Sequence, residues 1–587
     1  MPMLRKGGVS RITLPNGQSH DLTNQLELAL GNAGYSRERI IRYAFLVETA
    51  LQEWRDRLPA DAPLSYARLD RGKDLEYTVE LPGEPCNPFA LPEGGTEDGL
   101  SVAALVDRLQ SGVGNEIRYA YRRGVNRIRI RLPKSDVEDT VFRRNLFVLL
   151  VPVALEFLLE TIASSVDAIM LSFSDAYAMS AVTMAMGFSS FQGYVIFACT
   201  VGATSLISQY WGIRDRASIG KVAGLALKVS VAASLVFAVF ALGWPRTIMA
   251  FYTNVPEIVE RGVPYVRLIS FLFLLSPLYR LHYCCIRALG RPRASMAYAI
   301  AGCVTNVALN AVFIYGLFGA PRLGTLGVGI ATAVSAALQT ALALVDYLRQ
   351  REFRLDFGCP LRGHSLSAKF RKNMLPTLAQ CMVWILGANV IASVVGHMRA
   401  DVVAANSLLM LIFGMLLCLQ QGYGVSAGLL LGSLLGRGQL DRARHCGTVV
   451  LKVAVKLGLC IALAFAAIGL FLRYLPLDMN ANMSRLVLLM IPVFCVNTVF
   501  GMMNSSICQG ALYIGGDAKG LLLMDGIFMW GFLVPAALVG AYCLYLPELA
   551  LIAIVRNDET LSFPLKLLRF RSGKWLKNMT GNADGRR

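Results

Sequence analysis

Three carboxylic acids lie in one short apolar stretch, PVALEFLLETIASSVD, which begins at Pro152. In a helix with about 100° per residue, Glu156, Glu160 and Asp167 fall within about 40° of one another. An ionised side chain at the centre of a bilayer costs roughly 2.5–3.5 kcal/mol even on lenient insertion scales. Clustered carboxylates also disfavour joint ionisation. Such a stripe is suited to proton uptake or cation exchange, and we predict that it is an ion-coupling site.

An alternative explanation exists for the first two acids. Glu156 or Glu160 could pair with a basic group such as Lys228, or extend toward the membrane surface. In that case the two carboxylates would have a structural role.

The stretch opens a long hydrophobic region. The chain has 587 residues, of which 55% are hydrophobic and 16% charged, with a mean hydropathy of +0.51. Soluble proteins carry about a quarter charged residues. From about residue 145, apolar runs recur that are long enough to cross a hydrocarbon core of about 30 Å. We predict an all-α polytopic membrane protein of about twelve helices, of which the last is interrupted by charged residues at 556–559.

The positive charges are distributed as expected for a membrane protein. The net charge is +18, and the basic residues gather in alternate short loops and in the tail. This is the pattern of the positive-inside rule, so we predict that both termini are cytoplasmic and that nucleic acid is not a partner. The 13 cysteines are scattered and form no CxxC pair, so we expect neither disulfides nor a metal site.

The hydrophobic region contains an internal repeat. GIRDRASIGKVAGLALKVSV, from Gly212, aligns with GRGQLDRARHCGTVVLKVAV, from Gly436, and the same offset in numbering (436 − 212 = 224) carries Pro152 onto Pro376. We predict two six-helix lobes at 145–349 and 370–570, a basic linker at 350–369 and a basic tail at 571–587. Parallel repeats imply a pseudo-two-fold axis along the membrane normal and a central cavity, as in alternating-access carriers. A channel or a receptor would not need this repeat.

The repeat does not extend to the acids. The same offset places Gln380, Trp384 and Ile391 opposite Glu156, Glu160 and Asp167. We therefore expect the coupling chemistry to be concentrated in the first lobe.

Other polar residues of the apolar runs are candidates for function. Asn306 and Asn310 are four residues apart and share a helix face, where they either bond helices together or extend the acid site. Asp525 is an acid within a second-lobe helix. It has either a structural role in an ion pair or a functional role in the substrate cavity. Gln192 and Gln380 are candidates for lining the substrate cavity.

Several segments together resemble the multidrug and toxic compound extrusion (MATE) family over about residues 145–580. They occur in the family's order: VDAIM (166–170), GATSLISQYWGIRD (202–215), RALGRPRASM (287–296), NVALNAVFIYGLFG (306–319) and GGDAKGLLLMDGIFMWGFLVP (515–535). The resemblance implies a monomeric secondary antiporter of a bacterial cytoplasmic membrane, without enzymatic activity or cofactor. It would export lipophilic, mostly cationic compounds in exchange for H⁺ or Na⁺.

The resemblance also assigns roles to residues. It implies ion coupling at Asp167, with Pro152 upstream, and a hydrogen-bond network that includes Asn306. Asn310 stands where the family often has an acid, which leaves the choice between H⁺ and Na⁺ open. Two rival functions remain. A flippase for a lipid-linked or polysaccharide precursor should need a basic cavity, and a membrane sensor would signal through the region in front of the helices.

That front region, residues 1–137, is charged and rich in turns. We predict a cytoplasmic α+β domain with strands at 11–14, 64–69, 75–81 and 125–133 and helices at 22–32, 37–57, 101–110 and 114–122. It resembles a GHKL-type ATPase domain, but Gln52 replaces the family's Asn after Glu48 and no Asp precedes Gly83. The resemblance therefore implies an inactive module that regulates the transporter or docks a partner; an unrelated α+β domain is the alternative.

Overall fold

The computed structural model comprises two compact units, residues 1–144 and 145–587. In the second unit and the helix that leads into it, the structure describes residues 136–173, 176–361, 363–472 and 480–581. In the first unit it describes residues 10–14, 64–70, 74–86 and 117–133, together with Glu27 and scattered helical positions between 41 and 54.

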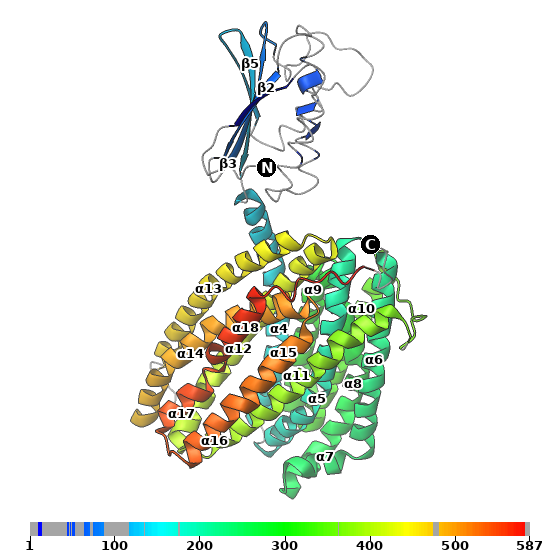
Figure 1. The fold of residues 1–587 in the computed structure, drawn as a ribbon. Helices are drawn as coiled ribbons and strands as arrows, with labels where there is room; N and C mark the ends of the chain where they lie inside the picture. The colour runs from blue at the N-terminus through cyan, green and yellow to red at the C-terminus, as the bar shows by residue number, and fades with distance from the viewer. Residues whose placement is uncertain are drawn as a thin grey trace. The chain divides into compact units, whose positions relative to one another are not determined.

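The first unit contains a five-stranded antiparallel sheet with the strand order β1-β2-β3-β5-β4 (Figure 1). Its strands are β1 (Ser10–Leu14), β2 (Leu64–Asp70), β3 (Asp74–Pro82), β4 (Ile117–Arg122) and β5 (Val125–Pro133). The four predicted strands are confirmed to within one residue at each end. The predicted helices at 22–32 and 101–110 lie almost entirely outside the described residues.

The predicted helix at 114–122 is wrong, because this segment forms β4 and pairs with β5. The two strands are joined by Arg123 and Gly124, which both have positive φ angles, of 53° and 76°. Positive φ at both central residues is typical of a two-residue hairpin turn whose twist matches that of the strands. The Arg-Gly pair was therefore the signal for a hairpin.

A buried asparagine holds the loop that follows β3. Asn126 is fully buried; its Oδ1 accepts from the Cys86 amide at 2.9 Å and its Nδ2 donates to the Glu84 carbonyl at 2.8 Å. The helix between residues 41 and 54 also reaches this loop, because the Trp54 indole donates to the Cys86 carbonyl. Glu48 and Gln52 lie on the exposed face of that helix.

The second unit is a helical bundle in two halves. The first lobe consists of α4 (Asp136–Ser172), α5 (Ala176–Gly212), α6 (Arg216–Gly243), α7 (Pro245–Tyr252), α8 (Pro256–Ala288), α9 (Pro292–Tyr315) and α10 (Thr325–Arg349), with a short turn, η1 (Leu317–Gly319), after α9.

The second lobe contains five long helices, two of which include a π-helical turn, and a sixth segment that is broken. Its elements are α11 (Ser365–Gly396), α12 (Ala400–Gly436), α13 (Leu440–Phe471), α14 (Ala481–Ile507), η3 (Cys508–Tyr513), α15 (Ala518–Phe528), η4 (Met529–Leu533), α16 (Val534–Tyr542), α17 (Glu548–Val555) and α18 (Asp558–Arg571). Both η3 and η4 are π-helical turns, which commonly occur at functional sites.

Ten of the predicted twelve spans are continuous helices with the length and composition to cross a membrane, counted over the described residues. The two others are irregular. One is α8, which is 33 residues long but carries several arginines, and the other is the pair α17 and α18, which is broken at Arg556 and Asn557. The interruption expected in the last span is therefore a real break.

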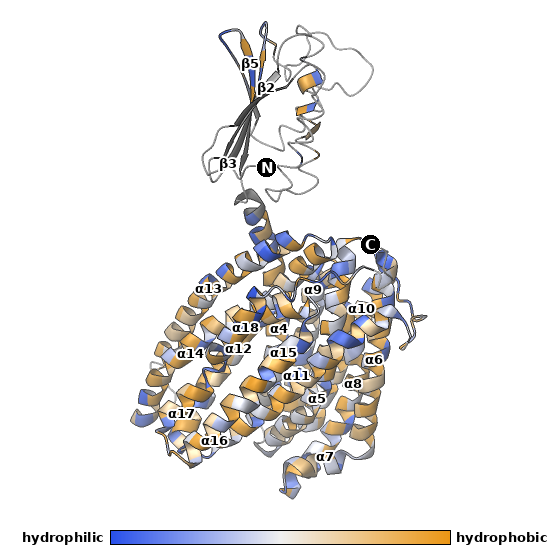
Figure 2. Ribbon diagram, viewed as in Figure 1, coloured by the Kyte–Doolittle hydropathy of each residue, from blue (hydrophilic) through white to orange (hydrophobic). Residues whose placement is uncertain are grey.

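The outer surface of the bundle is suited to lipid. Val304, Leu463 and Leu523 lie within helices yet expose 62%, 71% and 64% of their surface. Figure 2 shows hydrophobic residues along most of the helix lengths and hydrophilic residues gathered mainly toward the ends. Hydrocarbon, rather than water, is the solvent in which such helices are stable.

The helix boundaries confirm the repeat. The helices α5 and α12 begin at Ala176 and Ala400 and end at Gly212 and Gly436, so both boundaries keep the offset of 224. The same offset relates the starts of α6 and α13 and the ends of α4 and α11. Pro152 and Pro376 lie within α4 and α11, as predicted.

The lobes meet where α5 and α12 end, in a contact that only glycine allows. A Cβ atom added at Gly212 would lie 2.4 Å from the Ser433 carbonyl oxygen, and one at Gly436 would lie 1.9 Å from the Gln209 carbonyl oxygen. Gln209 and Ser433 are themselves related by the offset, so the two contacts are equivalents under the repeat. The pseudo-two-fold axis therefore passes between them.

The C-terminal tail crosses this junction. The side-chain amide of Gln209 donates to the Lys577 carbonyl at 3.3 Å. Its oxygen accepts a hydrogen bond from the backbone amide of Met579 at 2.7 Å. Asn578 donates to the Gly436 carbonyl on the other lobe at 3.4 Å. The tail thus binds both lobes at the end of the bundle that carries the basic loops.

We predict that Gly436→Leu destabilises the protein by about 1–3 kcal/mol, because the new side chain overpacks the junction. The measurement is thermal unfolding of the purified protein in detergent. Gly414→Leu, in the same helix, is the control, since a Cβ at Gly414 meets nothing within 4 Å. Equal melting temperatures for the two variants would contradict a close contact at Gly436.

Candidate functional site

The first candidate site is a cavity between the lobes. It is lined by residues of α4, α5 and α8 from the first lobe and of α12 and η3 from the second. Among the described residues, four lining side chains carry charge: Glu156, Glu160, Arg280 and Arg287. Tyr513, at the end of the π-helical turn η3, contributes from the second lobe.

Each carboxylate of this cavity pairs with an arginine of α8. Arg287 Nη1 lies 2.9 Å from Glu156 Oε1, and Arg280 Nη1 lies 3.4 Å from Glu160 Oε2. Structural pairing of these two glutamates, the alternative we considered, is therefore what the structure shows. The partner is not Lys228, which donates instead to the Phe357 and Cys359 carbonyls of the linker.

The predicted stripe of three acids is thus divided. Asp167 forms neither ion pair and lies in a second cavity of about 230 Å³ within the first lobe, which Glu160 and Arg280 also line. Asn310 of α9 donates to Asp167 Oδ1 and to Asn306 Oδ1, the latter at 3.2 Å. Asn306 in turn donates to the Thr332 hydroxyl of α10 at 3.4 Å. The predicted link between the acid of α4 and the asparagines of α9 is present.

The local sequence explains this arrangement. Asn306 and Asn310 are one helical turn apart on α9, so both face α4, and both are buried. Asp167 is 5% exposed and forms no ion pair within the described part of the chain. A buried carboxylate whose hydrogen-bond partners are neutral can take up a proton or bind a small cation.

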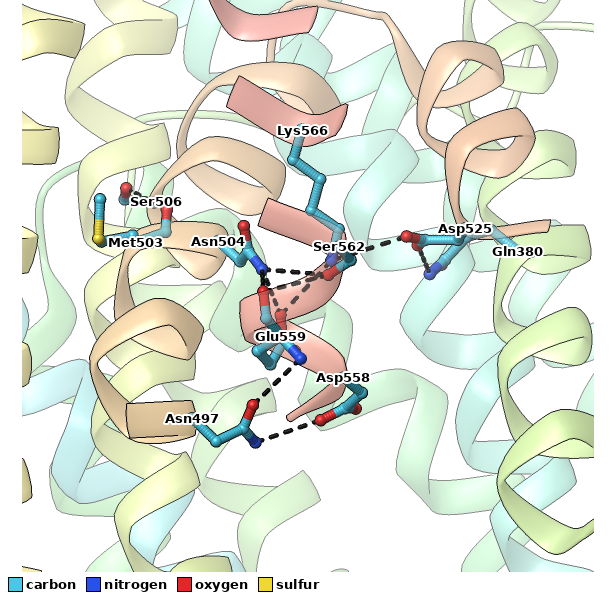
Figure 3. Close-up of polar contacts among 10 residues, drawn as sticks. All are labelled: Gln380, Asn497, Met503, Asn504, Ser506, Asp525, Asp558, Glu559, Ser562 and Lys566. Carbon is cyan, nitrogen blue, oxygen red and sulfur yellow. Dashed lines mark hydrogen bonds and ion pairs between the residues drawn. The ribbon is translucent and has the colours of Figure 1, made fainter. Parts of the chain in front are cut away.

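The structure reveals a third polar cluster in the second lobe, which joins the candidate Asp525 to residues that the sequence analysis did not single out (Figure 3). Lys566 of α18 is its centre, with its Nζ 3.4 Å from Glu559 Oε2 and 3.7 Å from Asp525 Oδ1. Asn504 of α14 donates to the same Glu559 oxygen at 2.7 Å, and Asn497 donates to Asp558 Oδ1 at 3.2 Å.

The break between α17 and α18 explains how these acids lie in the bundle. Helix α18 begins at Asp558, and the Asn497 side chain accepts a bond from the Glu559 amide at 3.1 Å, which satisfies a free donor of the first turn. Acids are also favourable at a helix N-terminus. The charged residues at 556–559, which we interpreted as an interruption of the last span, were the sequence signal for this cluster. We applied the offset of the repeat only to the acids of α4 and their equivalents in α11. It therefore could not reveal acids on other helices.

The other predicted residues have different outcomes. Gln380 donates to Asp525 Oδ2 at 2.7 Å and accepts from the Tyr513 hydroxyl at 2.8 Å, so it connects the second-lobe cluster to the lining of the inter-lobe cavity. Gln192 is buried and donates to the Ser234 and Ser276 hydroxyls, within the packing of α5, α6 and α8. Gln192 is not a lining residue of the cavities described above.

We predict that Lys566→Met lowers the free energy of unfolding by about 3–5 kcal/mol, because it leaves Asp525 and Glu559 buried without a counter-charge. The double variant Lys566→Met/Asp525→Asn should recover part of this loss. Thermal unfolding measures both, with the exposed Lys519→Met as the control. A double variant no more stable than the single one would contradict charge imbalance as the cause.

Comparisons with known proteins agree with this architecture. The family model MatE matches residues 152–312, which cover most of the first lobe. A probable multidrug resistance protein NorM of Neisseria meningitidis is 33% identical over 177 residues, which are 28% of this chain and 36% of the relative. YoeA of Bacillus subtilis, also a probable multidrug resistance protein, is 23% identical over 351 residues, or 58% of this chain and 73% of the relative. The chain thus spans about a third of the first relative and nearly three quarters of the second.

Solved structures match the bundle over its whole length. The Vibrio cholerae MATE transporter VcmN in its bent form superposes with a TM-score of 0.66 at 15% identity and covers 75% of this chain and 100% of its own. A transporter of the MOP superfamily from Pyrococcus furiosus gives a TM-score of 0.64 at 18% identity, over 74% of this chain and 97% of its own. At these identities the likeness shows the fold. The chain is thus similar to the MatE family model over residues 152–312 and to solved MATE transporters in the fold of its bundle.

Proposed function

We propose that the protein is a secondary antiporter of a bacterial cytoplasmic membrane that exports small amphipathic molecules in exchange for H⁺ or Na⁺. The observation that carries this proposal is Asp167, a buried carboxylate held by Asn310 and lying in a cavity of the first lobe. The names of the relatives, which are multidrug resistance proteins, support export of foreign compounds.

The three sites of the bundle have different charge environments, and this difference supports coupling at Asp167. Glu156 and Glu160 are neutralised by arginines, and Asp525 and Glu559 share Lys566. Within the described part of the chain, Asp167 accepts a bond from the Asn310 amide, which leads on to Asn306 and the Thr332 hydroxyl. Of these acids it is therefore the one whose charge depends on uptake of an ion from outside the chain.

The glycine contact between α5 and α12 supports alternating access. It lies at the end with the basic loops, which the positive-inside rule assigns to the cytoplasm. In this arrangement the lobes are closed on that side. Loading Asp167 with an ion would then change the packing of α4 against α9, and this change would bias the lobes toward the opposite arrangement.

The charge of the inter-lobe cavity bears on the rival function. A flippase for a phosphate-bearing precursor should expose unpaired basic side chains, whereas Arg280 and Arg287 each have a glutamate partner. Pocket polarity has been taken to suggest a different function for the Pyrococcus furiosus relative. Pairing of both arginines favours export of amphipathic molecules over translocation of a polyanionic lipid.

We predict that Asp167→Asn reduces efflux at least tenfold for every compound that the wild-type protein exports, because asparagine cannot exchange an ion. The measurement is accumulation of fluorescent dyes, including ethidium and rhodamine B, in cells that express each variant at equal levels. Glu257→Gln, an exposed acid at the start of α8, is the control and should transport normally. Unchanged efflux by Asp167→Asn would exclude coupling at this residue.

For the front unit we propose a regulatory or docking role without ATP hydrolysis. The departures at Gln52 and before Gly83 support this role, since the resemblance places metal and nucleotide binding there. We expect no heat on titration of the purified full-length protein with ATP and Mg²⁺. Micromolar binding that is lost in Glu48→Gln would contradict the proposal.

A further inference from the structure

A third cavity lies in the first lobe, between α6, α8, α10 and the basic linker. It has a volume of about 140 Å³ and shares no lining residue with the two cavities described above. Aliphatic and aromatic side chains form most of its wall, and His282, Thr340 and Tyr347 are its polar members. Such an interior suits a hydrocarbon chain rather than a charged solute.

The cavity opens toward the lipid-facing surface of the bundle. Leu278 and Leu344 line it, yet they expose 38% and 55% of their surface. Leu348, one turn further along α10, exposes 61%. This side of α10 therefore faces hydrocarbon, and an acyl chain can enter the cavity without crossing water.

The length of the cavity corresponds to one leaflet of the bilayer. Thr340 is its lining residue on α10 that lies farthest from the helix end at Arg349, and it precedes that end by nine positions (349 − 340 = 9). At 1.5 Å per residue this is about 13 Å, and half of a hydrocarbon core is about 15 Å thick. The positive-inside rule assigns the basic linker, and with it this end of the cavity, to the cytoplasmic leaflet.

The linker closes the cytoplasmic end of the cavity. Phe353 and Leu355 line the cavity, and the Leu355 amide donates to the Tyr347 hydroxyl at 3.0 Å. A Cβ atom added at Gly220 would collide with the Arg354 carbonyl oxygen, so this part of the linker packs directly on α6. The cytoplasmic end of the cavity is therefore a packed part of the first lobe.

Arginines surround this end of the cavity. Arg349, Arg351 and Arg354 are exposed and form no ion pair within the described part of the chain. The Arg354 guanidinium lies 5.7 Å from the ring centre of Tyr347, which is a lining residue. A phosphate at the membrane surface would therefore find a cation directly beside the apolar cavity.

The neighbouring acids do not cancel these charges. Asp346 is already bound by Arg291 at 2.8 Å and by His282 at 2.9 Å. Segment 349–356 carries two further acids, Glu352 and Asp356, against its three arginines, and Lys228 of α6 adds a positive charge where it binds the Cys359 carbonyl. Basic groups at this depth of the cytoplasmic leaflet attract anionic lipid.

We propose that this cavity binds one acyl chain of an anionic phospholipid of the cytoplasmic leaflet, whose phosphate lies at Arg351 and Arg354. A phosphatidylcholine has the same chains and the same phosphate, but its choline cation meets the excess positive charge and weakens binding. The site lies apart from Asp167 and does not depend on the proposed export function.

Native mass spectrometry of the purified full-length protein in detergent tests the headgroup. The first phosphatidylglycerol should bind at least tenfold more tightly than phosphatidylcholine with identical chains. Arg354→Gln should weaken phosphatidylglycerol about fivefold, whereas Arg444→Gln, at an exposed position of the second lobe, should leave it unchanged. Equal affinity for the two lipids, or displacement of phosphatidylglycerol by millimolar glycerol phosphate, would overturn the proposal.

A photoactivatable diazirine in the acyl chain of phosphatidylglycerol tests the cavity itself. In the wild-type protein the label should attach to peptides that contain residues 278–285 and 340–347. Ala343→Trp fills the cavity and should abolish this labelling, whereas Ala341→Trp, at an exposed position of the same helix, should preserve it. Labelling of the wild-type protein only at other sites would show that the arginines attract lipid without a chain in the cavity, and it would overturn the proposal.

Discussion

Hydrocarbon solvates ions poorly, so every carboxylate within the bundle needs a counter-charge, hydrogen-bond donors or a proton. The structure meets this requirement in three ways. Glu156 and Glu160 have arginines of α8, and Asp525 and Glu559 share Lys566. Among the described residues, Asp167 has neutral partners, which are Asn310 directly and Asn306 and Thr332 through it. The first two solutions link helices through ion pairs, whereas the third leaves a carboxylate without a counter-charge, as the proposed ion coupling requires.

The scaffold is symmetric, but its chemistry is not. Helices α5 and α12 keep the offset of the repeat at both ends, and the glycine contacts at Gly212 and Gly436 recur with it. The acids of the three sites follow no such rule, since Glu156, Glu160 and Asp167 lie on α4, whereas Asp525 lies on α15 and Glu559 on α18. The shared scaffold is suited to a rocking motion of two similar lobes, while the different acids allow each lobe a different role in it.

Much of the fold was predictable from the sequence, because hydrophobic runs, basic loops and repeated motifs are local patterns. The position of Pro152 and Pro376 and four of five strands are examples, whereas the link between Asp167 and the α9 asparagines was implied by the family resemblance. Partners that come from distant segments were not predictable. Arg280 and Arg287 belong to α8, which is distant in sequence from the acids of α4, and Lys566 lies on the far side of a helix break. Strand β4 was missed because its hairpin turn consists of Arg123 and Gly124 rather than the more familiar Asn-Gly pair.

The central claim is that an ion taken up at Asp167 drives movement of a small molecule through the bundle. The most direct measurement uses purified protein in liposomes, with a pH gradient and a sodium gradient imposed separately while rhodamine B movement is followed. The account predicts movement that follows one of the two gradients and is absent when that gradient is collapsed. Movement that is equally fast with no gradient, or that responds to neither one, would contradict it.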